Sequence, residues 1–139
     1  MFYKNFITET WKGQIDLVGD SIEVLLIDTE FYTFDENHKY ESQIPANAII
    51  SSAELTGKTV NGLVFTADDL SFSDAQVKPN KVCSAIIISQ NSGYLETSKL
   101  ICYIDDAPEF PVQEIDSDFS ISWPVEGIFE AEFPIAGGG

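Results

Sequence analysis

The fold is decided by the stretch VCSAIIISQNSGYLETSKLICYID, residues 82–105. Two apolar runs, residues 82–90 and 98–105, flank a short segment rich in turn-forming residues. Apolar side chains at consecutive positions are typical of a strand that is buried on both of its faces. We therefore predict that the two runs form a hairpin of core strands in the middle of a sheet.

Upstream, residues 21–28 predict a further strand, followed by a loop. The pattern becomes apolar on both faces after Glu23, so we expect a central strand. Residues 31–45 mix aromatic with charged side chains without a clean period and end at Pro45. Such a segment is typical of a long loop, here with room for one helical turn. It fits a functional loop as well as a plain covering over the end of a sheet.

A second hairpin is predicted within residues 55–67. Asn61-Gly62 lies there between β-rich flanks and is the preferred dipeptide of a type I′ turn, in which both residues adopt positive φ. The resulting register puts Val60 and Phe65 on one face of the hairpin.

Two short strands are predicted near the C-terminus. DFSISW, residues 118–123, and IFEAEF, residues 128–133, alternate apolar with polar side chains. This period of two is typical of strands with one face on the core. The side chains expected to face inward are Phe119, Ile121, Trp123, Phe129, Ala131 and Phe133.

Residues 2–12 predict one short amphipathic helix. Aromatic side chains recur there at helical spacing, and Gly13 stands where a glycine often terminates a helix. The aromatic stripe suits a partner-binding face, but docking on the protein's own core is the more common role of such a stripe.

Together these elements predict an all-β fold, an antiparallel β-sandwich or barrel of about seven strands with one short N-terminal helix. The 139 residues suit a single domain, which at this size buries about 70% of the surface of its unfolded chain. We assign the domain to residues 1–133, including the helix, and a Gly-rich tail to residues 134–139.

The charge balance argues against several classes of partner. There are 23 acidic and 7 basic side chains, giving a formal charge of −16 at pH 7. Phosphate backbones and anionic membrane surfaces repel such a chain, so we expect no direct nucleic-acid or membrane partner. No basic segment followed by a long apolar one is found at the N-terminus, and we expect a soluble protein made in a cytoplasm.

Motifs of catalysis are absent. His38, the single histidine, lies in a charged loop without a nucleophile motif nearby, and the sequence lacks the glycine-rich phosphate loops and His-Glu-x-x-His. We therefore expect no catalytic residues, no enzyme activity and no cofactor. Cys83 and Cys102 lie in apolar strands without metal-ligand spacing and are expected as buried thiols, unless the strands bring them close enough to pair.

Carboxylates are the remaining candidates for chemistry. Acidic pairs occur at residues 35–36, 68–69 and 105–106. Glu114, Asp116 and Asp118 alternate along one predicted strand face and are the candidates for a cation site, because calcium takes six to eight oxygen ligands. Alternating acids beside apolar residues are more often the solvent face of a strand, so we assign no metal site.

Five segments of the sequence resemble a group of small virion proteins of tailed bacteriophages, known mostly as uncharacterised structural proteins. These are KGQIDLVGDSIEVLLIDTEFYTFD (12–35), LTGKTVNGLVFTADDLSF (55–72), AIIISQ (85–90), SKLICYID followed by FPV (98–112) and ISWPVEGIF (121–129). Their order and spacing are similar to that group over residues 12–129. No catalytic motif defines the group, so the resemblance concerns a β scaffold with its turns.

The resemblance implies a structural protein of the virion, assembled in the host cytoplasm. Within that class we expect a decoration or cement protein on the outside of the head, with a tail or head-to-tail component as the alternative. Its partners would be the major capsid protein or other virion proteins, and sister subunits in a homo-oligomer. The candidate contact residues are Phe2, Tyr3, Phe6, Trp11, Tyr32, Phe34, Tyr40 and Ile135.

A function of another class also remains open. β-Sandwich domains commonly present aromatic and acidic loop residues to carbohydrates, so a carbohydrate-binding or host-adhesion module is a further alternative. Its aromatic platform would consist of Tyr32, Phe34, Tyr40 and Tyr94, which could equally cap the core.

Overall fold

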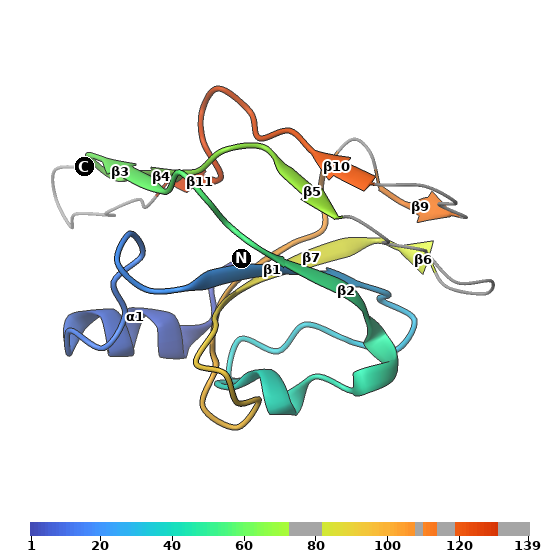
Figure 1. The fold of residues 1–139 in the computed structure, drawn as a ribbon. Helices are drawn as coiled ribbons and strands as arrows, with labels where there is room; N and C mark the ends of the chain where they lie inside the picture. Colours follow the sequence, from blue (N-terminus) through green and yellow to red (C-terminus); the bar gives the residue numbers. More distant parts are fainter. Residues whose placement is uncertain (73–81, 108–109, 114–118, 131–139) are drawn as a thin grey trace, which may run out of the picture.

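The computed structural model describes residues 1–72, 82–107, 110–113 and 119–130, and within these it is all-β with one short helix. The strands form two layers, and a long loop lies against the outer face of one of them (Figure 1). α1 lies beside β8, with Phe6 in the core between the layers. The predicted fold class, an antiparallel sandwich with an N-terminal helix, is therefore confirmed. The described residues contain eleven strands rather than about seven, because residues 82–90 are divided into two strands and three further strands were not predicted.

The elements have the following bounds. The helix is α1 (Lys4–Trp11), and two short 3₁₀ helices are η1 (Glu41–Gln43) and η2 (Ala46–Ala48). The strands are β1 (Ile22–Ile27), β2 (Ile49–Glu54), β3 (Thr59–Asn61), β4 (Val64–Thr66), β5 (Leu70–Phe72), β6 (Val82–Cys83), β7 (Ala85–Gln90), β8 (Lys99–Ile104), β9 (Val112–Gln113), β10 (Phe119–Ile121) and β11 (Phe129–Glu130).

The first layer is a four-stranded antiparallel sheet in the order β2-β1-β7-β8. β1 is internal, and β7 and β8 form a hairpin, as predicted. β8 lies at the edge, however, so its placement in the middle of the sheet was wrong. Its outer edge is covered by the chain itself, since the Tyr3 and Leu100 amides donate to the Ile101 and Lys39 carbonyls at 3.1 and 3.0 Å. Covered in this way, an edge strand can be apolar on both faces.

A bulge explains the unbroken apolar run of β8. Ile88 pairs with Cys102 and Ser89 with Leu100, so Ile101 is the extra residue between two pairs. Ile101 and Cys102 both enter the core between the layers, although neighbours on a regular strand point to opposite faces.

The second layer consists of small sheets, β11-β4-β3 and β10-β5, with the β6-β9 pair beside them (Figure 1). Phe65 and Phe72 of this layer pack against one face of the four-stranded sheet and are almost completely buried. The side chains that they meet from that sheet include Ile22, Val24, Leu26, Ile86 and Ile88. This is the main core of the sandwich.

The other face of the four-stranded sheet is covered by loop rather than by strands. Tyr3, Tyr32 and Ile44 lie against it in a second buried cluster, which includes Ile27 and Ile87 of the sheet. The predicted long loop is confirmed, and its helical turn is η1.

The helix begins later than predicted, at Lys4 instead of residue 2. Phe2 pairs with Cys102 in an isolated β-bridge, so the residues before α1 are extended along β8. Gly13 follows the helix with φ +75°, as expected for the terminating glycine.

The β3–β4 hairpin is confirmed, with its turn displaced by one residue. Asn61 pairs with Val64, so the two-residue loop is Gly62-Leu63 and not Asn61-Gly62. Gly62 has φ +62°, the conformation that a tight hairpin needs at its first loop position. Val60 and Phe65 are direct partners and share a face, as predicted.

The C-terminal strands follow the predicted alternation where the structure describes them. Ile121, Trp123 and Phe129 pack against the main core, and Ser120 and Ser122 are exposed. The side chains of Phe119, Ala131 and Phe133 lie outside the described part. Neither β2 nor β5 was predicted.

Candidate functional site

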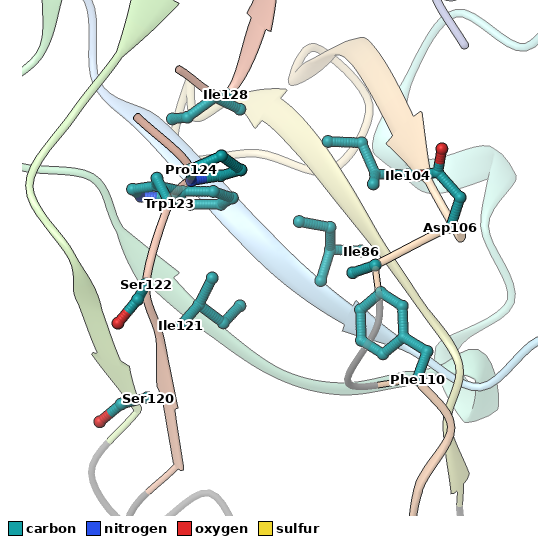
Figure 2. A pocket seen from close by; sticks show the side chains of 11 residues that line it. Ile86, Ile104, Asp106, Phe110, Ser120, Ile121, Ser122, Trp123, Pro124 and Ile128 are labelled. Atoms are coloured by element: carbon teal, nitrogen blue, oxygen red, sulfur yellow. The ribbon is translucent and has the colours of Figure 1, made fainter. Parts of the chain in front are cut away.

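A pocket of about 460 Å³ opens into the main core between the two layers. Its walls come from β7 and β8 on one side and from β10 and the segment behind it on the other (Figure 2). The lining residues are Ile86, Ile104, Asp106, Ala107, Phe110, Ser120, Ile121, Ser122, Trp123, Pro124 and Ile128.

The course of the chain explains why the sandwich is open here. After Ile104 the chain leaves β8 and crosses toward β9, in the other part of the molecule, instead of continuing along the sheet. The Phe110 amide donates to the Ala107 carbonyl at 3.1 Å, which turns the crossing segment and places Phe110 on the pocket wall. The two layers are thus bridged by a connection and not by paired strands at this edge.

The opposite wall is held by hydrogen bonds to Trp123. The Trp123 Nε1 group donates to the Asp68 carbonyl at 3.1 Å, and the Trp123 amide donates to Asp69 Oδ1 at 3.2 Å. The polar edge of the indole is therefore satisfied behind the wall, and its apolar surface lines the pocket.

The chemistry of the pocket is that of an apolar receptor. In Figure 2 the Ser120 and Ser122 hydroxyls point away from the cavity, while Ile86, Ile104 and Ile121 surround it. Asp106 is the single charged side chain among the described lining residues and lies at the margin. The described lining residues can therefore hold an apolar group.

Asp105 and Asp106 are adjacent in the sequence but border different hollows. Asp106 borders the pocket between the layers, whereas Asp105 borders a shallower hollow on the loop-covered side, with Tyr32, Phe34 and Tyr103. Both aspartates are exposed, as expected for the end of a strand. Neighbouring side chains of an extended chain point to opposite sides, which separates the two carboxylates.

The other acidic pairs are held by local partners. Asp35 Oδ1 accepts from the Asn37 amide at 2.9 Å, and Glu36 pairs with Lys4 at 3.2 Å. Within the described residues, no group of three or more His, Cys, Asp or Glu side chains is arranged to hold a metal ion. Glu114, Asp116 and Asp118, the cation candidates, lie outside the described part.

A carboxyl cluster that the sequence did not reveal lies near the start of β1. Glu23 pairs across the sheet with Glu54, and its carboxyl group lies within hydrogen-bonding reach of Glu41, which is buried in η1. Burial, then the hydrogen bond to Glu41 and the charges of Glu41 and Glu54, raise the pKa of Glu23 to about 8. Glu41 follows Glu23 by 18 positions in the sequence, so only the tertiary contact could reveal this pair.

His38 belongs to a buried hydrogen-bond chain. Its Nδ1 lies 2.9 Å from the Tyr32 hydroxyl, which lies 2.9 Å from the Tyr3 hydroxyl. Its Nε2 lies 3.8 Å from Asp35 Oδ2. These hydrogen bonds fasten the loop that carries Tyr32 and His38 to the N-terminal segment that carries Tyr3.

The predicted contact residues divide by exposure. Tyr3, Phe6 and Tyr32 are buried in the protein's own core and are not available to a partner in this structure. Phe2, Phe34 and Tyr40 are partly covered, Trp11 is 83% exposed, and Ile135 lies outside the described part. Of the proposed carbohydrate platform, only Tyr94 is largely exposed, at 72%.

A second surface feature, here named the apolar end, consists of Trp11, Val18, Val60 and Leu63. All four side chains are exposed, and the β3–β4 hairpin and the end of α1 lie toward the same end of the molecule (Figure 1). Lys58, directly before β3, donates to the Asp20 carbonyl, which ties the hairpin to the loop of Val18.

Both cysteines are free and buried in the main core. Burial raises the pKa of the Cys83 thiol to about 11, so the thiol stays protonated at neutral pH.

In the described part of the chain, no helix has the length and apolar character needed to cross a membrane.

Comparisons with protein families and with curated proteins identify no relative. No protein-family model matches the sequence, and no curated protein matches it.

Proposed function

We propose that this chain is a non-enzymatic structural protein of a tailed-bacteriophage particle, a decoration or cement subunit on the outside of the head. The class of protein is suggested by the resemblance of residues 12–129 to small virion proteins of tailed bacteriophages. The β-sandwich is consistent with such a role, although a scaffold of this kind serves many functions.

The observation that carries the proposal is the apolar end on a strongly acidic domain. Trp11 is 83% exposed, Val60 50% and Leu63 48%, on a chain with a formal charge of −16. Exposed apolar side chains on segments at the same end of a molecule favour a contact surface there. The charge keeps free subunits dispersed until a complementary lattice supplies the rest of the contact.

The charge also favours the outer surface of the head. Packaged DNA is a dense polyanion, which repels an acidic subunit inside the shell. A position outside the shell removes this repulsion.

The position in the particle tests the proposal directly. Particles from a phage that encodes this chain are purified, separated into heads and tails, and probed with an antibody against the recombinant protein. We expect the protein in the head fraction, accessible to the antibody on intact heads. Recovery in tails alone would favour the tail component, and absence from washed particles would refute the proposal.

The contact surface has its own test. The double variant Trp11→Ser/Val60→Ser is added to heads that lack the protein and should bind at least tenfold more weakly than the parent. Val125→Ser is the matched control, because Val125 is 99% exposed in another turn. An equal loss of binding to heads in the double variant and in Val125→Ser would contradict a role of the apolar end.

A further inference from the structure

We propose that the pocket between the layers is a receptor for an apolar side chain flanked by lysine or arginine, presented by a partner protein. This site is separate from the apolar end. The inference needs a partner protein but does not require that the partner be a capsid protein.

Size and lining favour an apolar occupant. The volume of about 460 Å³ lies within the range of ligand sites and exceeds what a few waters fill. Ile104, Phe110, Ile121 and Trp123 line it and are only partly buried, although each packs against the main core. An apolar group that entered here would remove these side chains from water, which is the main source of affinity at such sites.

Charge favours a basic flank. Asp106 lies at the margin, is exposed, and is the charged side chain among the described lining residues. No lysine is among these lining residues, and the chain as a whole carries a formal charge of −16. A basic residue beside the inserted side chain would meet Asp106, whereas an acidic one would be repelled.

The occupant is a side chain of a second protein because the pocket is open to the surface and both walls end in loops. The crossing segment with Asp106 and Ala107 forms one rim, and Ser122 to Pro124 forms the other. An extended peptide can lie across these rims and insert one side chain between them. The apolar insertion supplies the affinity, and Asp106 at the rim selects the charge of the neighbours.

Trp123 is a built-in reporter for this binding. The chain contains two tryptophans, and Trp11 is 83% exposed on α1 and is not among the pocket residues. The variant Trp11→Phe therefore leaves Trp123 as the only indole. Three probes are titrated into this variant: acetyl-Lys-Leu-Lys-amide, acetyl-Lys-Ser-Lys-amide and acetyl-Glu-Leu-Glu-amide.

We expect a saturable blue shift of the Trp123 emission with the Lys-Leu-Lys peptide. The Lys-Ser-Lys peptide should bind about tenfold or more weakly, since a pocket contact of one apolar side chain has this order of effect. The Glu-Leu-Glu peptide should bind about tenfold more weakly, because Asp106 and the net charge of −16 repel its carboxylates.

Variants of the pocket supply the second arm of the test, each in the Trp11→Phe background. Ala107→Phe fills the cavity from its rim and should abolish the shift, and Ala107→Leu serves if the larger side chain disturbs folding, which circular dichroism checks. Asp106→Asn should weaken the Lys-Leu-Lys peptide about two- to fivefold, the effect of an exposed charge pair. Glu126→Asn, an exposed acid in the turn behind the pocket wall, is the matched control.

Three results would overturn the inference. One is the absence of a saturable shift up to the solubility limit of the Lys-Leu-Lys peptide. Another is equal affinity for the Lys-Leu-Lys and Lys-Ser-Lys peptides, which would show association by charge alone. The third is unchanged affinity in folded Ala107→Phe, which would place the contact elsewhere.

Discussion

The two faces of the four-stranded sheet are closed by different means. One face packs against a second layer of strands, in which Phe65 and Phe72 carry much of the contact. The other face is closed by an extended N-terminus and a long loop, fastened by the hydrogen bonds among Tyr3, Tyr32 and His38. The strand cover leaves an apolar pocket at one edge, whereas the loop cover is fastened by polar ties and leaves a shallower hollow beside Asp105.

The difference shows what each kind of cover can do. The backbone groups of a strand are hydrogen-bonded to neighbouring strands, so its contact with the other layer is made by apolar side chains. A gap in this contact, such as the pocket, is therefore lined mainly by apolar side chains. A loop has no ladder, and its backbone and side chains must find partners on the sheet, which brings polar groups such as Glu41 into the interface.

The largest expected effect compares the two faces directly. Ile87 and Ile88 are neighbours on β7, both with no exposed surface, and each points to a different cluster. Ile87→Ala and Ile88→Ala should each lower the free energy of unfolding by about 2–5 kcal/mol, measured by urea denaturation. A loss below 1 kcal/mol at one site alone would show that its cover is not packed in solution.

The next effect concerns the tie on the loop-covered face. Tyr32→Phe leaves the buried Tyr3 hydroxyl without its partner and should cost about 1–3 kcal/mol in thermal or urea unfolding. The double variant Tyr3→Phe/Tyr32→Phe removes both hydroxyls and should cost less than Tyr32→Phe alone. If the double variant is the less stable of the two, this hydrogen bond does not fasten the loop.

A smaller effect depends on pH. The pKa of Glu23 is raised from 4.5 to about 8, so the folded state keeps a proton that the unfolded state has released. Stability from this group is therefore complete below pH 4.5 and is lost as the pH rises toward 8. Glu23→Gln should flatten this decline relative to the parent in melts across the interval, and the control Glu126→Gln should retain it. If the decline of stability with pH is the same in Glu23→Gln as in the parent, the raised pKa of Glu23 is contradicted.

The smallest effect is expected at the end of β8. Asp105 and Asp106 are both exposed, and the double variant Asp105→Asn/Asp106→Asn should change the free energy of unfolding by no more than about 0.5 kcal/mol. A melting curve beside that of the parent measures this. Unfolding of the variant where the parent is stable would show that the pair supports the fold.

The local patterns were sufficient for β1, β7 and β8 of the first layer, but not for β2. Residues 82–90 and 98–105 contain unbroken apolar runs, and such runs are specific for buried strands when turn residues bound them. The long loop and the hairpin near Asn61-Gly62 were also predictable. The shift of that turn by one residue was not, because the dipeptide alone does not specify which residues pair across the strands, here Val60 with Phe65 and Asn61 with Val64.

The site was far less predictable, for a physical reason. Ile86 and Ile121 are far apart in the sequence, and each has the pattern of an ordinary core residue. Only the crossing of the chain after β8 leaves a gap between them.

The sequence by itself determined the all-β class, the acidic surface and the core strands, because these follow from composition and from the local period of apolar residues. The tertiary structure alone decided three further features: the edge position of β8, the Glu23–Glu41 pair and the pocket between the layers. Each of these depends on segments distant in the sequence that meet in space, and no local pattern contains that information.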